Sequence, residues 1–305
     1  MDILIIGHSV EDHIFFRDRH QATKPGGIFY SAAAFSTFAE ADDNLMLMTS
    51  TEKANYQLFE NVYRKVNLEF TYNTEAIPKN HLMVFDDKER HEKYENITNK
   101  LNIGITDFSR FDGIYVNMIT GFDISLDDAL RMRNNFRGPM FIDVHTLSRG
   151  IEPNYVRNFR RIPHFEEWGK AFDIIQVNEN ELLTVSSLRK EPDIAKYLFS
   201  LGVKVLIITK GDKGVTMYFR ENEAIKHTSL DATDIVTANR IGCGDMFGSV
   251  FFYYYLKTKD LGKSLELANL AAGCLASYAD LKEIGKLKND VFTRYYKKKD
   301  SDIRG

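Results

Sequence analysis

The stretch TANRIGCGDMFGSVFFYYYL, residues 237–256, places two glycines directly before an aspartate and a long apolar run. The apolar run predicts a buried helix that begins close to Asp245. The first backbone N–H groups of a helix have no partner inside the helix and carry the positive end of its dipole. Gly242, Cys243 and Gly244 are small enough to let an anion approach these groups. The stretch therefore predicts an anion hole beside a carboxylate that can take a proton from a substrate hydroxyl.

Composition and charge exclude several other classes of protein. The chain has 305 residues, of which 44% are hydrophobic and 27% charged, and its formal net charge is −3. This composition is typical of a globular protein and indicates neither a nucleic acid nor a membrane surface as a partner. Cys243 and Cys274 lack a CxxC spacing, so they support neither a disulfide framework nor a zinc site. The first residues resemble no signal peptide and no run is long enough to span a membrane, so we expect a cytoplasmic protein.

Short β-branched runs alternate with helical patterns along most of the chain. Runs such as ILIIG and VLIIT are apolar at consecutive positions, which is typical of strands buried on both faces. Strands that alternate with helices predict βαβ units. We therefore expect one α/β domain over residues 1–305, with three α/β/α layers and a mostly parallel central sheet. The predicted strands are residues 3–7, 45–50, 113–119, 140–145, 172–178 and 203–211, and the predicted helices are residues 29–40, 125–136, 178–187, 191–202, 244–258 and 264–281.

Two segments interrupt this alternation. Residues 11–25 are polar and aromatic, and residues 68–99 alternate apolar and polar side chains over several short runs. Such alternation is typical of half-exposed strands. We expect the two segments to form a small antiparallel β lid over one edge of the main sheet. Exposed edge strands are often covered by a second subunit, so we also predict a possible homodimer through the lid.

Taken alone, a Gly-x-Gly-Asp sequence is more often a turn followed by a first-turn acid than a catalytic site. Here, however, six further short motifs occur along the chain. Together they resemble the ribokinase-like carbohydrate kinases, the family of ribokinase, fructokinase and adenosine kinase, whose corresponding turn reads GAGD. Each motif is weak by itself, and the order and separation of all six carry the resemblance. The motif positions are Asp12 after the first strand, Gly26 and Gly27, Asp143 with Arg149, Asn178 with Glu181, Thr209 with Gly211 and Gly214, and Asn269.

The resemblance implies a role for each of these positions. It implies that Asp245 is the catalytic base and that Gly242, Cys243 and Gly244 form the anion hole. The implied substrate-binding residues are Asp12, Gly26, Gly27 and Ser31, the implied ATP-binding residues are Asn178, Thr209, Gly211, Gly214 and Asn269, and the implied Mg²⁺ residue is Glu181.

Some of these positions also have plainer explanations. Thr209 ends an apolar strand, where ligands bind in open α/β sheets, but the KGDKG that follows it also fits an ordinary β-turn. Glu181 can hold Mg²⁺ through waters, or it can be the first-turn acid of a helix capped by Asn178. Asp12 can bind paired hydroxyls or lie in a solvated loop. The family motifs favour the functional explanation in each case.

The chain departs from the family at two places. Upstream of the glycine pair the family usually has Asp-Thr, where this chain has Asn239, Arg240 and Ile241. In many members that acid helps to hold a monovalent cation, so we predict weak or absent K⁺ activation, with Arg240 as a built-in positive charge. Members that bind pentoses carry asparagines where this chain has Val10 and Ser31. The acceptor therefore fits a polyol such as inositol, a modified sugar or a nucleoside at least as well as ribose.

Phosphoryl transfer needs positioning and charge neutralisation more than covalent chemistry, and the predicted site supplies both. We therefore expect an ATP-dependent kinase that transfers the γ-phosphate to a hydroxyl of a small sugar, polyol or nucleoside. A protein that binds a sugar or nucleotide without efficient turnover is the alternative. A structural or interaction protein that retains only the scaffold is less favoured, because a scaffold does not need Asp245 with both glycines.

Overall fold

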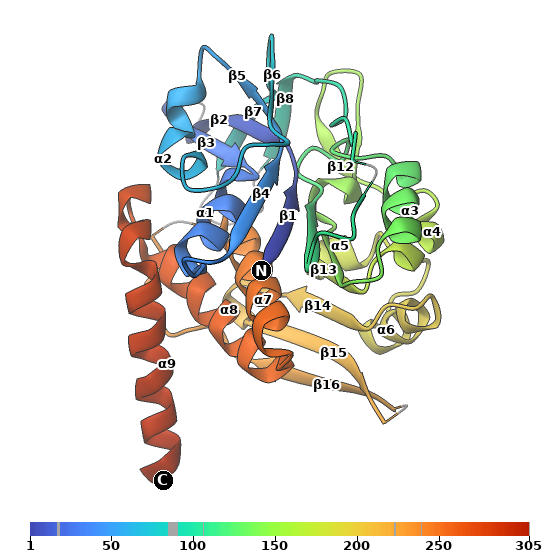
Figure 1. Cartoon of the computed structure of the whole chain (residues 1–305), viewed down its shortest axis with the longest axis vertical. Coiled ribbons are helices and arrows are strands. Elements are labelled where there is room, and N and C mark those ends of the chain that lie inside the picture. The colour runs from blue at the N-terminus through green and yellow to red at the C-terminus, as the bar shows by residue number, and fades with distance from the viewer. Residues whose placement is uncertain (17–18, 85–90, 106, 223, 239, 305) are drawn as a thin grey trace.

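The computed structural model of the protein describes residues 1–16, 19–84, 91–105, 107–222, 224–238 and 240–304. Within these residues an eight-stranded sheet has the order β16-β15-β14-β13-β10-β9-β1-β4, with helices on both faces (Figure 1). The strands from β14 to β4 run parallel, and β15 and β16 continue the sheet antiparallel at one end. This three-layer arrangement confirms the predicted fold class.

The strands and helices have the following bounds. The central sheet comprises β1 (Asp2–Ile6), β4 (Asn44–Met48), β9 (Gly113–Asn117), β10 (Met140–Asp143), β13 (Ile174–Asn178), β14 (Val205–Thr209), β15 (Val215–Glu221) and β16 (Ala224–Leu230). The other strands are β2 (Ser9–Phe16), β3 (Arg19–Gly27), β5 (Ser50–Glu52), β6 (Tyr72–Thr74), β7 (Lys79–Val84), β8 (His91–Asn96), β11 (Arg149–Ile151) and β12 (Arg157–Phe159). The helices are α1 (Phe29–Phe38), α2 (Glu60–Tyr63), α3 (Leu126–Asn135), α4 (Phe165–Ala171), α5 (Glu179–Leu182), α6 (Glu191–Ser200), α7 (Cys243–Thr258), α8 (Leu261–Ser277) and α9 (Leu287–Arg304), with short 3₁₀ turns at Tyr56–Leu58, His145–Ser148, Gly211–Lys213 and Leu281–Lys286.

The two faces of the central sheet carry separate cores. Successive side chains of a strand point to opposite faces, and β1 divides its residues accordingly. Ile3 and Ile5 pack with α1, α7 and α8 on one face, whereas Leu4 and Ile6 pack with α3, α4 and α6 on the other. Because both faces are covered by helices, the parallel strands are apolar at consecutive positions. This is the pattern from which the sequence predicts them.

A second, four-stranded sheet has the order β3-β2-β7-β8, and we call it the small sheet. It lies beyond the carboxyl ends of the parallel strands (Figure 1). The prediction of an antiparallel sheet from residues 11–25 and 68–99 was partly wrong. The central pair β2 and β7 is parallel, and β6 pairs with β5 in a separate sheet. Residues 17, 18 and 85–90 of these segments lie outside the described residues.

The two edges of the small sheet differ. At the β8 edge, Lys93 forms an antiparallel bridge with Val156, and Tyr94 N donates to Tyr155 O over 3.1 Å. A neighbouring part of the same chain therefore covers part of this edge. At the β3 edge, the described residues place no further strand. A homodimer through the small sheet stays a prediction, and β3 is the edge that it would use.

Several other predictions need correction. The helix predicted at 178–187 is one short turn, Glu179–Leu182, because an Asn-capped turn ends where Leu183 and Thr184 close it. No helix is predicted for the C-terminal residues, which form the long helix α9, whose first part buries Leu287 and Val291 against the α1–α7–α8 core. Figure 1 shows the rest of α9 running away from the sheet. No helix in the described part of the chain is both long and apolar enough to cross a membrane.

Candidate active site

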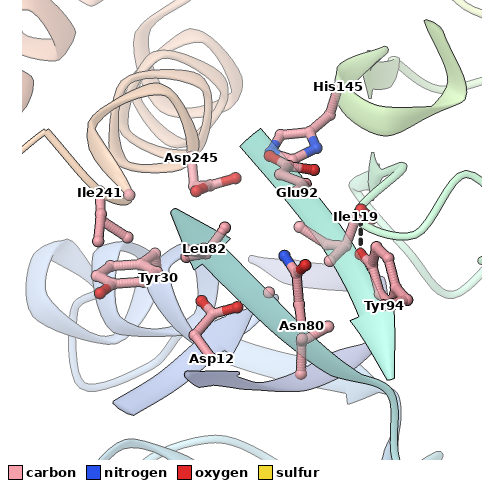
Figure 2. Close-up of a pocket in the computed structure, with 13 residues that line it drawn as sticks. Asp12, Tyr30, Asn80, Leu82, Glu92, Tyr94, Ile119, His145, Ile241 and Asp245 are labelled. Carbon is pink, nitrogen blue, oxygen red and sulfur yellow. Dashed lines mark hydrogen bonds between the residues drawn. The ribbon is translucent and has the colours of Figure 1, made fainter. Parts of the chain in front are cut away.

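A cavity of about 400 Å³, including its open mouth, lies between the small sheet and the carboxyl edge of the central sheet. One wall consists of alternate side chains of β2, β7 and β8, namely Val10, Asp12, Asn80, Leu82, Glu92 and Tyr94. The opposite wall includes the start of α7, with Ile241, Gly242 and Asp245. Figure 2 shows Asp245 pointing from the start of α7 towards Asp12 and the inner face of the small sheet. Residues far apart in the sequence thus face one space.

Asp245 lies in the first turn of α7 and is only 8% exposed. Its Oδ1 accepts a 2.6 Å hydrogen bond from Asn117 Nδ2. Asn117 is the last residue of β9 and is fully buried. The bond fixes the direction of the carboxylate, which lines the cavity instead of facing bulk solvent. Asp245 is therefore in the position that a base facing a substrate hydroxyl needs.

Ser31 lies behind this carboxylate and does not line the cavity. It is fully buried on α1, and Asn117 Nδ2 also approaches its Oγ at 3.3 Å. Its own hydroxyl donates to Tyr115 OH over 3.5 Å. In this structure Ser31 contacts the residue that holds Asp245, which differs from the direct substrate contact that the family resemblance implies.

The turn before α7 needs its first glycine for a steric reason. Gly242 has φ +79°, and a Cβ there would lie 2.2 Å from the ring of Tyr30. Gly242 is the N-cap residue of α7 and has no side chain, and the first intrahelical bond runs from Met246 N to Gly242 O. A Cβ on Gly244 would meet nothing closer than Gln176 Nε2, at 4.0 Å. The space beside the first turn is thus open to an incoming anion.

Gln176 connects this turn to the central sheet. Its Nε2 donates to Gly244 O over 3.0 Å and to Asp143 Oδ2 over 2.7 Å. Gln176 lies on β13 and Asp143 ends β10, so the start of α7 is attached to two neighbouring strands. The attachment fixes the first turn of α7 relative to the carboxyl edge of the sheet.

Asp12 packs directly on the glycine pair of β3. A Cβ on Gly26 would lie 1.9 Å from Asp12 Oδ2, and Gly27 has φ +64° with His8 O at 2.3 Å from its would-be Cβ. Asp12 and Gly26 lie on adjacent strands, and Asp12 is 6% exposed at the cavity wall. The predicted solvated-loop alternative for Asp12 is therefore excluded. The structure brings Asp12, Gly27 and Asp245 to the same cavity.

Asn178 and Glu181 form a reciprocal cap at the end of β13. Asn178 Oδ1 accepts from Glu181 N at 2.9 Å, and the Glu181 carboxylate accepts from Asn178 N at 2.9 Å and from Asn178 Nδ2 at 2.8 Å. The capping explanation of this motif is thus observed. It keeps Glu181 buried near the carboxyl edge, where its negative charge helps to raise the pKa of Asp143.

Thr209 ends β14 beside Asn178 and opens the loop that carries Gly211 and Gly214. Both glycines have positive φ, +59° and +89°. A Cβ on Gly214 would lie 2.0 Å from Leu230 O, whereas a Cβ on Gly211 would meet nothing within 4 Å. Gly214 is therefore required by packing against β16, and Gly211 leaves the loop accessible at the carboxyl edge.

Three carboxylates gather at this edge. Burial, together with the negative charges of Glu181 and Asp245, raises the pKa of Asp143 well above its usual range. A bound divalent cation would relieve this repulsion, so the residues fit a cation held there. Among the described residues, however, no three acidic, histidine or cysteine side chains are close enough to ligate one ion directly. The residues fit Mg²⁺ that keeps most of its waters.

Asn269 and Arg240 are not among the residues that line the cavity. Asn269 is on α8, where its Nδ2 donates to Asp231 O over 2.9 Å. Arg240 is exposed two residues before Gly242. Asn239, on which the prediction about a monovalent cation rests, lies outside the described residues. The structure thus brings Asn269 and Asp231 together but does not join them to the acceptor cavity.

Sequence reasoning missed the cavity residues Asn80, Glu92, Tyr94 and His145, as well as Asn117 behind Asp245. The small-sheet residues had a usable signal, because polar side chains stand at inward positions of alternating strands. His145 has φ +39°, which is uncommon for a residue other than glycine and marks strain at a cavity wall. Figure 2 shows His145 and Glu92 among the residues that line the cavity.

The protein has three α/β/α layers, and its cavity lies between the central sheet and the small sheet. This arrangement is the ribokinase fold. The profile of the pfkB family of carbohydrate kinases matches residues 146–283. The match includes the Asn178–Glu181 cap, the Thr209 loop and the start of α7. The predicted resemblance to ribokinase-like carbohydrate kinases is thereby confirmed.

Three relatives illustrate the range of this resemblance. The cytidine kinase of Thermococcus kodakarensis is 23% identical over 276 residues, which cover 88% of this chain and 93% of that protein. A pyrophosphate-dependent kinase in the ribokinase family, solved with a pyrophosphate analogue and myo-inositol, superposes with a TM-score of 0.76 at 14% identity, covering 91% of this chain and 96% of the other. Ribokinase from Cryptococcus neoformans var. grubii serotype A, solved with ADP, gives a TM-score of 0.73 at 16% identity, covering 96% and 99%. At these identities the structural matches establish the fold.

Proposed function

We propose that the protein is an ATP-dependent kinase that phosphorylates a hydroxyl of a small sugar, polyol or nucleoside. The observation that carries the proposal is the position of Asp245. Its carboxylate is held by Asn117, lines the cavity, and lies in the first turn of a helix whose N-cap residue is a glycine. A base and an anion hole within one helical turn are what phosphoryl transfer to an alcohol requires.

In the proposed reaction, Asp245 accepts the proton of the acceptor hydroxyl as the oxygen of that hydroxyl bonds to the γ-phosphorus. The bond between the γ-phosphorus and the oxygen that links it to the β-phosphate breaks. The first amides of α7 neutralise the charge on the transferring group, and Gln176 keeps this turn in place through Gly244 O. Asp12 holds the acceptor from the small sheet. The chain positions the reactants and neutralises charge.

Mg²⁺ would supply charge neutralisation on the phosphates of ATP. Glu181 and Asp143 would hold it through water molecules at the carboxyl edge, where their mutual repulsion favours a cation. Asn178, Thr209 and Gly211 would face the donor, with Asn269 further along its length. We further propose that the small sheet serves as a lid within one kinase domain, excluding the water that competes with the acceptor.

A transfer assay tests the proposal. Purified protein is given MgATP with ribose, myo-inositol or cytidine. In parallel assays pyrophosphate replaces ATP, because one relative is pyrophosphate-dependent and another was solved with ADP. Wild type is expected to phosphorylate at least one acceptor, and Asp245→Asn is expected to lose activity by about 10³-fold or more while acceptors still raise its melting temperature. Asp127→Asn, an exposed first-turn acid of α3, is the matched control. Binding of donor and acceptor by wild type without any transfer would instead favour a sensor or degenerate kinase.

A further inference from the structure

The inner face of the small sheet carries polar side chains where an ordinary lid strand would carry apolar ones. Asp12, Asn80 and Glu92 all line the cavity and are 6%, 5% and 3% exposed. They come from three adjacent strands, with Asn80 paired in register with Asp12 on one side and with Tyr94 on the other. Figure 2 shows the Asn80 amide between Asp245 above and Asp12 below. These side chains would face the acceptor directly.

Asn80 is the member of this set with an unmet hydrogen-bonding requirement. Its Oδ1 is buried and has no hydrogen-bond partner among the residues that the structure describes. A buried polar atom without a partner costs free energy, and in native proteins such atoms often await a ligand or a water molecule. Water can donate to Oδ1 in the empty cavity, but an acceptor molecule that displaces this water has to reproduce its hydrogen bond.

The other polar groups around Asn80 also accept more than they donate. Carboxylates accept hydrogen bonds only, and Asp12, Glu92 and Asp245 are all in the lining. Tyr94 already gives its hydroxyl proton to Ile119 O, over 3.4 Å (Figure 2). No lysine or arginine occurs among the described lining residues. The cavity is thus matched to a molecule rich in O–H or N–H donors and free of anionic groups.

We propose that Asn80 is a specificity-determining residue that requires an O–H or N–H donor on the edge of the acceptor facing the small sheet. This inference rests on the proposed kinase function. A site built to hydrogen-bond a substrate group rejects an analogue that lacks the group, because its own buried atom is then left unpaired. An acceptor with hydrogen or a carbonyl oxygen at that position leaves Asn80 Oδ1 without a donor. Phosphorylated sugars are excluded by the surrounding carboxylates.

The test uses acceptors that differ by a single donor. Myo-inositol is compared with its monodeoxy analogues, and cytidine with its 2′-deoxy and 3′-deoxy analogues, each of which lacks one O–H donor. For wild type, loss of the donor at one position is expected to lower kcat/KM by about 100-fold or more. In Asn80→Leu the same loss is expected to cost less than about threefold, and Asn80→Asp, which retains an oxygen acceptor, is expected to keep the wild-type preference. Lys93→Leu, on the exposed outer face of β8, is the matched control.

The outcomes separate the two proposals. If wild type transfers phosphate but Asn80→Leu keeps the full preference at every position, the role of Asn80 is overturned and the kinase function stands. If no acceptor is phosphorylated, the kinase function fails. The same acceptor pairs are then ranked by thermal shift without a phosphate donor, and equal shifts for both members of every pair in wild type overturn the role of Asn80 in binding too.

Discussion

The first turn of α7 and the inner face of the small sheet border the same cavity, but they are built differently. The turn takes its functional groups from consecutive residues, Gly242 to Asp245, and sets them on one rigid helix of 16 residues. The small sheet takes its groups from alternate positions on three strands, at Asp12, Asn80 and Glu92. A contiguous site leaves a motif in the sequence, whereas a site assembled from separate strands leaves only an alternation of buried and exposed residues.

The largest effect on activity is expected within the turn itself. Gly242 is required by its backbone conformation, whereas Gly244 leaves space beside the first turn of the helix. Gly244→Ala should fold normally and gain about 0.5–1 kcal/mol of helix stability, because its Cβ meets only Gln176 Nε2 at 4.0 Å. The methyl group would nevertheless occupy the approach to the anion hole, so kcat should fall by about 10²–10³-fold. Kinetics and thermal melting check this. The control is Gly262→Ala, the exposed second residue of α8.

If Gly244→Ala keeps kcat within a few-fold of wild type, the open space beside the first turn does not receive the transferring phosphate. Loss of folding in this variant would likewise contradict the steric argument. Gly242→Ala provides the contrast, because it should destabilise the protein through its φ of +79° and the overlap with Tyr30.

The corresponding glycine of the small sheet should affect binding of the acceptor more than the chemical step. In Gly26→Ala the new Cβ would overlap Asp12 Oδ2, at 1.9 Å, and has to displace that carboxylate. The KM of the acceptor should rise by about 30-fold, with the KM of the donor unchanged, since one charged hydrogen-bond partner of the acceptor is misplaced. Steady-state kinetics in both substrates checks this, with Gly104→Ala, where nothing lies within 4 Å, as the control. An equal rise in the KM of the donor would contradict the division between the two regions.

The same contrast explains how much could be predicted from the sequence. The six parallel strands and α1, α3, α6, α7 and α8 follow from apolar runs and helical periodicity, because burial on both faces imposes those patterns. The small sheet was placed only approximately. The parallel pairing of β2 with β7 depends on contacts between residues 68 positions apart, which no local pattern encodes.

The candidate site divides in the same way. Asp245 and its glycines could be predicted because helix geometry alone brings neighbouring residues together. Asn117 and Gln176 could not, because each is a single polar residue in an otherwise apolar strand, at the end of β9 and in the middle of β13. Their partners, Asp245 and Gly244 O, lie 128 and 68 positions away. For Ser31, the resemblance implies a substrate contact, whereas in the structure Ser31 is buried behind Asn117 and is not among the residues that line the cavity.

The acidic edge beside the turn should make stability depend on pH. The pKa of Asp143 is raised in the folded protein by burial and by Glu181 and Asp245, so the folded state holds a proton that the unfolded state releases above its ordinary pKa. Stability from this group is therefore full at low pH and declines as pH rises above about 4, by up to about 1.4 kcal/mol per pH unit. In Asp143→Asn this contribution to the slope should vanish. Urea unfolding at pH 5, 6 and 7 compares the two proteins, and identical slopes would contradict the raised pKa.

The smallest expected effect concerns the residues just before the turn. In many members of the family a carboxylate upstream of the glycine pair helps to hold a monovalent cation, whereas this chain has Asn239, Arg240 and Ile241 there. Arg240 is exposed close to the turn and already supplies a positive charge. Replacing Na⁺ by K⁺ at constant ionic strength should therefore change kcat less than about twofold, because the cation would have little to neutralise. The control is Asn239→Asp, which restores the acid and should introduce a K⁺ response. A large stimulation of wild type by K⁺ would mean that other groups near the turn hold the cation, and the turn would then depend on more than its consecutive residues.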